Sequence, residues 1–151
     1  MAKYTVVDNN PENKSEKRVR YFLTFLFFLQ TVATTLPFMQ GTVGQEFKSI
    51  SALQLLIQPD GYTSGGDVFI AVAGGLLVVT PIVAFFFCVL DSRSRIKYLA
   101  SGITSVLCAI LICFGQMLSI GSVITLILNV LCLFMTMQGL QATNARMHSA
   151  E

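Results

Sequence analysis

Asp91-Ser92-Arg93-Ser94-Arg95-Ile96-Lys97-Tyr98 decides the fold, because this segment places three cations between two long uncharged runs. Residues 68–90 before it and 99–145 after it contain no Asp, Glu, Lys or Arg. As a helix the first run is about 34 Å long, against a hydrocarbon core of roughly 30 Å. The pattern therefore indicates a cytoplasmic loop that joins two membrane spans. The second run is long enough to fold back once.

The composition of the 151-residue chain also favours a membrane protein. Hydrophobic residues make up 54% and charged residues 12%, whereas a soluble domain carries about twice that share of charge. The four cysteines all fall in apolar runs, and His148, the one histidine, lies in the polar C-terminal segment. No Cys/His spacing typical of a zinc site is present. We expect no metal, no other cofactor and no nucleic-acid partner.

We predict an all-α fold: a polytopic integral membrane protein with a four-transmembrane-helix bundle and a short interfacial helix in its first outer loop. The expected transmembrane domain covers 21–142, between a basic tail over 1–20 and a second tail over 143–151. Its expected spans and loops are spans 21–39, 68–90, 99–120 and 123–141, outer loop 41–66, cytoplasmic loop 91–98 and a tight reversal at 119–122.

Two local patterns refine this architecture. Glu16 and Arg20 lie four residues apart, which indicates a helical extension ahead of the first span. In the outer loop, apolar residues recur at helical spacing from Phe47 to Ile57 before Pro59 ends the pattern. This spacing predicts a short amphipathic helix in the outer interface, either a docking surface or only a connector.

The cations predict the orientation of the chain in the cell membrane. Nine of the ten lie on one side of the expected spans, and only Lys48 lies on the other. Because positive residues stay on the cytoplasmic side, both termini are expected to be cytoplasmic. The residues expected to set this topology are Arg18, Arg20, Arg93, Arg95 and Lys97.

Small and weakly polar side chains recur along one face of each of the last two spans. The third span carries Ser101, Ser105, Ala109 and Cys113, and the fourth carries Gly121, Thr125, Asn129, Cys132, Thr136 and Gly139. In lipid, helices associate through close backbone approach and interhelical hydrogen bonds, so we expect these faces to meet each other or the bundle centre. Asn129 is expected to bond to Ser105, Thr104, a backbone carbonyl or its copy in another protomer.

The remaining polar and helix-bending residues have two interpretations. Asn129, Gln30 and Gln116 are either the lining of a pathway or the hydrogen-bonding groups that hold helices together. Pro81 lies mid-span, where its missing N–H bends a helix. The bend is either a hinge or a packing adaptation.

Several classes of protein are disfavoured. No Asp, Glu, Lys, Arg or His lies inside an expected span, which argues against proton-coupled transport, and no phosphate loop or hydrolase motif is present. Four spans with one large outer loop resemble the layout of claudins and tetraspanins. Claudin-type outer loops need Trp and paired Cys, however, and the large tetraspanin loop lies between the third and fourth spans. The chain has neither feature, so the sequence indicates no family.

The leading hypothesis is a non-enzymatic accessory, assembly or scaffold subunit. Its expected surroundings are the lipid bilayer, and its expected partners are other membrane proteins or copies of itself. The alternative is a small oligomeric channel or transporter with a weakly polar pathway. An enzyme acting on lipid would have to use interfacial residues such as Asp67, Asp91, Arg93 or Arg95.

Overall fold

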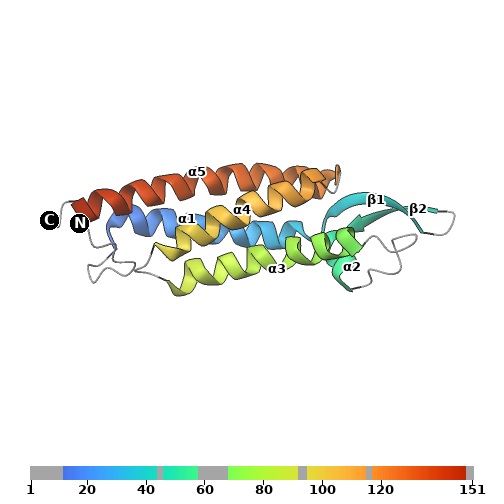
Figure 1. The fold of residues 1–151 in the computed structure, drawn as a ribbon, viewed down its shortest axis with the longest axis horizontal. Coiled ribbons are helices and arrows are strands. Elements are labelled where there is room, and N and C mark those ends of the chain that lie inside the picture. The colour runs from blue at the N-terminus through green and yellow to red at the C-terminus, as the bar shows by residue number, and fades with distance from the viewer. Residues whose placement is uncertain (1–11, 44–45, 58–67, 92–94, 115–116, 149–151) are drawn as a thin grey trace.

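The computed structural model describes residues 12–43, 46–57, 68–91, 95–114 and 117–148, and this part of the chain is mostly helical. Figure 1 shows the elements in chain order. They are α1 (Lys14–Ala33), β1 (Pro37–Val43), β2 (Glu46–Ser51), α2 (Ala52–Ile57), α3 (Val68–Leu90), α4 (Ile96–Phe114) and α5 (Ile120–His148).

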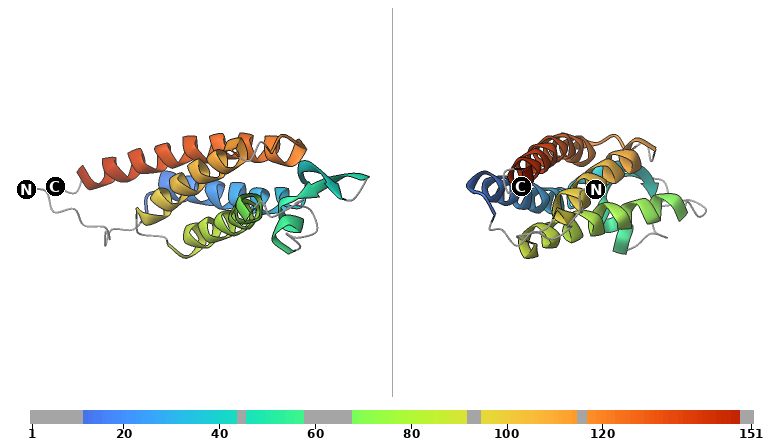
Figure 2. Two further views of the ribbon diagram at one scale, coloured as in Figure 1. Left: turned by 45° about the vertical axis from the view of Figure 1, so that its right-hand side comes forward. Right: turned by 60° about the vertical axis from the view of Figure 1, so that its left-hand side comes forward.

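The helices α1, α3, α4 and α5 lie side by side along the long axis of the molecule, and we call them the helical body (Figures 1 and 2). Both α1 and α4 pack against α3 and against α5. The two strands and α2 lie at one end, the hairpin end. At the opposite end, the charged end, α1 begins, α3 ends, α4 begins and α5 ends.

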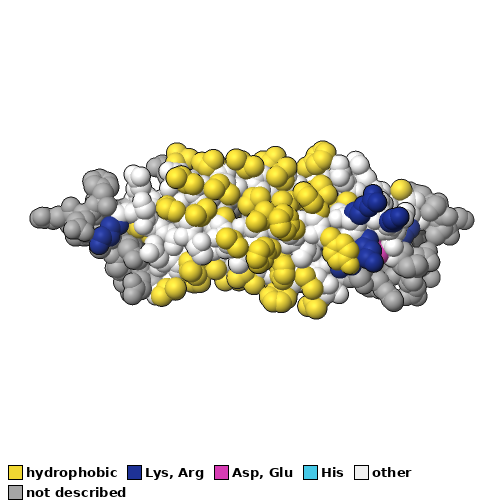
Figure 3. All heavy atoms as spheres, turned by 180° about the vertical axis from the view of Figure 1, so that it is seen from behind, with side chains coloured by type: hydrophobic (Ala, Val, Ile, Leu, Met, Phe, Trp, Pro, Cys, Tyr) yellow, Lys and Arg dark blue, Asp and Glu magenta, His cyan; other side chains and the backbone are white. Residues whose placement is uncertain are grey.

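Of the described helices, α3, α4 and α5 are long and apolar enough to cross a membrane. Each helix of the body also exposes large apolar side chains. Phe25, Phe86, Ile103 and Phe134, one from each helix, are all more than half exposed. In the space-filling view of one face, such side chains cover the middle of the molecule and cations gather at one end (Figure 3). Because soluble proteins rarely expose apolar patches this extensive, the helices suggest a membrane-embedded protein.

The first helix begins and ends at local hydrogen-bonding signals. Asn13 caps it: the Lys14 amide donates to Asn13 Oδ1 at 2.7 Å, and the Asn13 amide donates to Glu16 Oε2 at 3.3 Å. The expected helical extension ahead of residue 21 is therefore present. The expected span over 21–39 ends too late, because the helix stops at Ala33. Pro37 disfavours helical geometry in the residue before it.

A β-hairpin follows, which corrects the all-α prediction. The strands β1 and β2 pair antiparallel, from Pro37 opposite Ser51 to Val43 opposite Glu46. The helical spacing read from residue 47 onward was thus misleading over its first five residues, which belong to β2.

The helix expected in the outer loop is present only as α2. Ser51 and Gln54 form a capping box: the Ser51 amide donates to Gln54 Oε1 at 2.9 Å, and the Gln54 amide donates to Ser51 Oγ at 3.2 Å. Ser-x-x-Gln ahead of an apolar segment is a recognised helix start, so the boundary was readable from the sequence.

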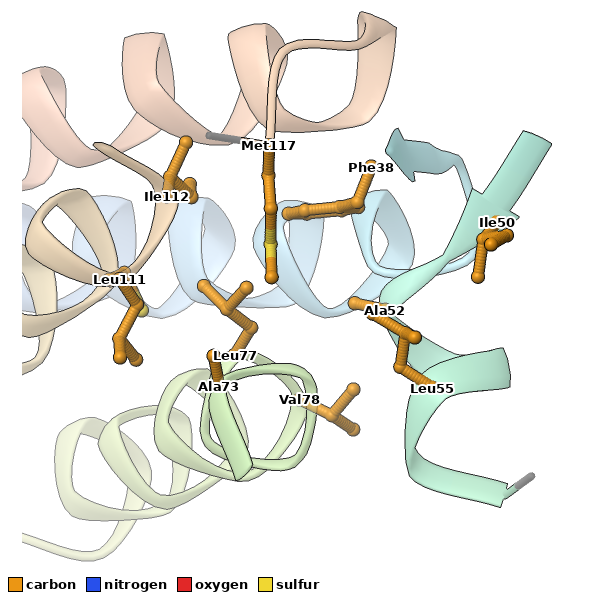
Figure 4. Close-up of a cluster of buried hydrophobic side chains, with 11 residues drawn as sticks. Phe38, Ile50, Ala52, Leu55, Ala73, Leu77, Val78, Leu111, Ile112 and Met117 are labelled. Atoms are coloured by element: carbon orange, nitrogen blue, oxygen red, sulfur yellow. The ribbon is translucent and has the colours of Figure 1, made fainter. Parts of the chain in front are cut away.

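The hairpin end packs tightly onto the helical body. Phe38 from β1, Leu55 from α2, Leu77 from α3 and Met117 from the segment before α5 are all buried in one cluster (Figure 4). A Cβ added at Gly121 would lie 2.6 Å from the Pro37 carbonyl oxygen. Because no side chain fits there, α5 begins in direct contact with β1.

The last three helices agree with their expected spans to different degrees. The helix α3 coincides with the run 68–90. The helix α4 begins and ends earlier than 99–120, and α5 extends beyond 123–141 at both ends. Ser122 Oγ accepts from the Ser119 amide at 2.8 Å. Residues 120–122, expected in the reversal, therefore form the first turn of α5.

Candidate functional site

The interior of the helical body holds a buried pair of amides from helices far apart in sequence. Gln30 Nε2 on α1 donates to Asn129 Oδ1 on α5, and neither residue is more than 1% exposed. Asn129 therefore bonds across the body as expected, but to α1 instead of to Ser105 or Thr104 on α4. Within the described part of the chain, Gln30 Oε1 and Asn129 Nδ2 have no hydrogen-bond partner.

The small-residue face expected on the fourth span points inward along its whole length. Its six residues are all buried: Gly121, Thr125, Asn129, Cys132, Thr136 and Gly139. Their successive spacings are four, four, three, four and three residues, which follows the 3.6-residue turn of a helix. This face supplies a continuous, weakly polar surface to the interior.

The matching face expected on the third span does not stay inside. Ser101 and Ser105 are fully buried, Ala109 is half-buried and Cys113 is exposed. A constant spacing of four residues turns by roughly 40° at each step, because a helix turns about 100° per residue. The expectation was therefore wrong for Cys113.

Thiols and hydroxyls join α3 to α4 along the face of α4 that is buried. Cys88 Sγ lies 3.4 Å from Ser101 Oγ, and Cys108 Sγ lies 3.3 Å from Thr80 Oγ1. The Thr80 hydroxyl also donates to the Leu76 carbonyl at 2.7 Å, immediately before the buried Pro81. The helix α3 runs through Pro81 as one element. Gln116 lies outside the described residues.

A network of buried ion pairs lies at the charged end. Glu12 bridges Arg20 at 3.1 Å and Lys97 at 2.6 Å, and Glu16 bridges Arg146 at 3.2 Å. The side chains in these pairs are only 2–11% exposed. Together they connect α1 to the start of α4 and to the last turns of α5.

The end of α3 joins the same network through its backbone. Arg20 Nη1 donates to the Cys88 carbonyl at 3.3 Å, one of the last four carbonyls of a helix, which lack partners within it. Arg20 and Lys97, both expected from the sequence to set the topology, thus also join separate helices. Arg18 is exposed, Arg95 is half-buried, and Arg93 lies outside the described residues.

The sequence pattern missed Glu12 and paired Glu16 with the wrong cation. The spacing of Glu16 and Arg20 suggested a pair along one helix turn, but Glu16 bridges Arg146 and Arg20 bridges Glu12. The local signal was Glu12 itself, an acid that sits next to the first helix among several cations.

The chain matches no protein-family model, no curated protein and no solved structure. Within the described ranges, no three His, Cys, Asp or Glu side chains group as metal ligands. The described side chains instead provide hydrogen-bonding groups, buried ion pairs and apolar surface. Such groups hold helices together and recognise lipids or other helices.

Two apolar grooves lie between neighbouring helices. One, of about 500 Å³, lies between α4 and α5, and its lining includes Gly102, Ile103, Val106 and Thr136. The other, of about 260 Å³, lies between α1 and α3. Sequence reasoning missed both, because a groove depends on how side chains of two helices meet.

Proposed function

We propose that the chain is a multi-pass protein of the cell membrane in which α1, α3, α4 and α5 form a four-helix transmembrane bundle. The apolar part of α1, residues 21–33, is only about 20 Å long, which is shorter than the hydrocarbon core. Its position between α3 and α5 and its exposed Phe22, Phe25 and Phe28 support a role as the fourth span. Local thinning of the bilayer accommodates a short span.

The distribution of cations supports an orientation with the charged end in the cytoplasm. The described cations there are Lys14, Lys17, Arg18, Arg20, Arg95, Lys97 and Arg146, whereas the hairpin end carries Lys48. By the positive-inside rule, α1 then begins and α5 ends on the cytoplasmic side. The exposed Leu56 and Ile57 of α2 suit an outer helix that rests on the membrane interface.

Within this membrane the protein acts as a non-enzymatic accessory, assembly or scaffold subunit that works through a protein partner. The observation that carries this proposal is the groove between α4 and α5. Its α4 side runs from Tyr98 to Ile110, about 18 Å along the axis, and Gly102 permits close backbone approach. A groove of this length with branched apolar walls suits a transmembrane helix of another protein.

Purification of the native-level tagged protein in mild detergent tests this proposal. We expect a stoichiometric second membrane protein, identified by mass spectrometry and by the mass of the particle. Gly102→Leu should reduce its recovery at least tenfold, because the new side chain enters the groove. Val130→Leu, which adds bulk at a residue of α5 that is 66% exposed and outside the groove lining, is the matched control. A particle that contains only copies of this chain would contradict the accessory role.

A second candidate, a small oligomeric channel or transporter, is favoured by one observation. Besides the two amide atoms, the buried Thr125 Oγ1 has no partner among the described residues. Buried polar atoms without protein partners are usually satisfied by water, and a file of water or a polar solute would satisfy these. Solute flux into liposomes that is lost in a folded Asn129→Leu variant would favour this candidate over the accessory role.

A further inference from the structure

We propose that the cytoplasmic half of α1, together with the groove that it shares with α3, binds one anionic phospholipid of the cytoplasmic leaflet. One face of α1 runs from cations into this groove at steps of three and four residues. Its members are Lys14, Lys17, Tyr21, Thr24, Phe28 and Thr31. The proposal rests on the membrane arrangement above but needs no protein partner.

Within the described residues, no salt bridge neutralises Lys14 or Lys17 on this face. The two acids of this segment, Glu12 and Glu16, are occupied, since Glu12 bridges Arg20 and Lys97 and Glu16 bridges Arg146. Lys14, Lys17 and Arg18 are exposed and form no salt bridge within the described residues. An anionic headgroup supplies the charge that these side chains lack.

Tyr21 marks where this charged surface meets the apolar surface. Its ring is 56% exposed, and Lys17 Nζ lies 6.0 Å from the ring centroid. Tyrosine side chains with one apolar and one polar end favour the headgroup level of a membrane. Lys14, Lys17 and Arg18 therefore lie at the depth of lipid phosphates.

The groove below Tyr21 is suited to an acyl chain. It is lined by Phe28 and Thr31 of α1 and by Ile82, Phe85 and Phe86 of α3. The Thr31 hydroxyl donates to the Phe27 carbonyl at 2.9 Å, so it is satisfied within its own helix. At about 260 Å³ the groove is smaller than the roughly 300–1,000 Å³ of sites for compact ligands. An extended hydrocarbon chain fits this shape better.

The distance between cations and groove matches a single lipid. Phe28 and Thr31 lie seven and ten residues beyond Tyr21, which is about 10–15 Å along the helix. One leaflet of the hydrocarbon core is about 15 Å deep. The Arg20 contact with the Cys88 carbonyl brings the end of α3 to the same level. One molecule can thus place its phosphate at the cations and one acyl chain in the groove.

Native mass spectrometry of the full chain with equal amounts of phosphatidylglycerol and phosphatidylcholine tests the site. We expect preferential retention of phosphatidylglycerol. Lys17→Gln should reduce that preference about fivefold, because one cation near an anionic surface contributes a binding free energy equivalent to about that factor. Lys48→Gln removes one cation at the hairpin end and should leave the preference unchanged. Equal retention of both lipids, or an equal loss in Lys48→Gln, would overturn the proposal.

A second variant tests the groove separately from the charge. Phe28→Ala should lower the retention of both lipids without changing their ratio, whereas Phe134→Ala, an exposed residue on α5, should change neither. Displacement of phosphatidylglycerol by glycerol phosphate would indicate a site for phosphate alone and overturn the assignment to lipid. Because a chain that purifies without a partner can still bind lipid, failure of the accessory role and failure of this site are distinguishable.

Discussion

At the scale of single residues, the Gln30–Asn129 pair explains how polar side chains are tolerated inside an apolar body. Each amide satisfies one group of the other, although both are fully buried. Hydrogen bonds between membrane helices contribute about 0.6–2 kcal/mol. Removing one partner has a further cost, because it leaves the other amide buried and without that bond.

A double-mutant cycle measures this coupling. We expect Asn129→Leu and Gln30→Leu each to destabilise the protein by about 1–2 kcal/mol. The double variant should lose less than the sum of the two, because neither amide is then left behind. Denaturant unfolding in detergent gives these values. Gln138→Leu, at an exposed position of the same helix, should be nearly neutral, and strict additivity would contradict the coupling.

At the scale of elements, the approach of α4 to α5 depends on a glycine at the charged end. A Cβ at Gly139 would overlap the ring of Tyr98, which is only 1% exposed. At Gly102 the same atom would lie 3.6 Å from Thr136 Cγ2, an ordinary contact. Two glycines on facing helices thus have different roles, close packing at Gly139 and open groove surface at Gly102.

The contrast between Gly139→Ala and Gly102→Ala tests this difference. We expect Gly139→Ala to lower stability by about 1–3 kcal/mol through overpacking. Gly102→Ala should be neutral or stabilising by up to about 1 kcal/mol, since alanine favours helices. Thermal unfolding in detergent reports both. Adding Tyr98→Leu to Gly139→Ala should recover part of the loss. Equal effects of the two alanines would show that α4 and α5 approach differently.

At the scale of the whole molecule, the ion network ties the charged end together. Glu12 lies before the first helix yet bridges Lys97 at the start of α4, and Glu16 holds the end of α5 through Arg146. Removing one partner of a buried ion pair destabilises a protein more than replacing the whole pair with apolar residues. The reason is that the remaining charge is then buried without a partner. The two acids therefore decide how the ends of the helices are held relative to one another.

Glu12→Gln should destabilise the protein by about 3 kcal/mol, because Arg20 and Lys97 then share no carboxylate. Lys14→Gln changes an exposed residue of the same segment and serves as the control, with an expected effect near zero. Unfolding in detergent gives the stability of each variant. Hydrogen exchange should show faster opening at the start of α4 in Glu12→Gln alone. Unchanged exchange there would show that the bridge does not hold α4.

The sequence by itself determined the apolar helices, the position of the charged end and the inward face of α5. Charges avoid lipid, and the 3.6-residue period repeats along one helix, so both are local properties of the chain. The six buried residues of α5 follow that period closely. The start of α2 directly after Ser51 was equally local, although the competing helical spacing concealed it.

Only the tertiary structure decided which groups meet. Gln30 bonds to a residue 99 positions away, and Glu12 bridges one 85 positions away. The pairing of β1 with β2, the exposure of Cys113 and the two grooves depend likewise on how separate elements pack. The physical reason is that hydrogen bonds, ion pairs and grooves require atoms to come within a few ångströms. A pattern along one segment contains no information about which distant segment supplies the other atom.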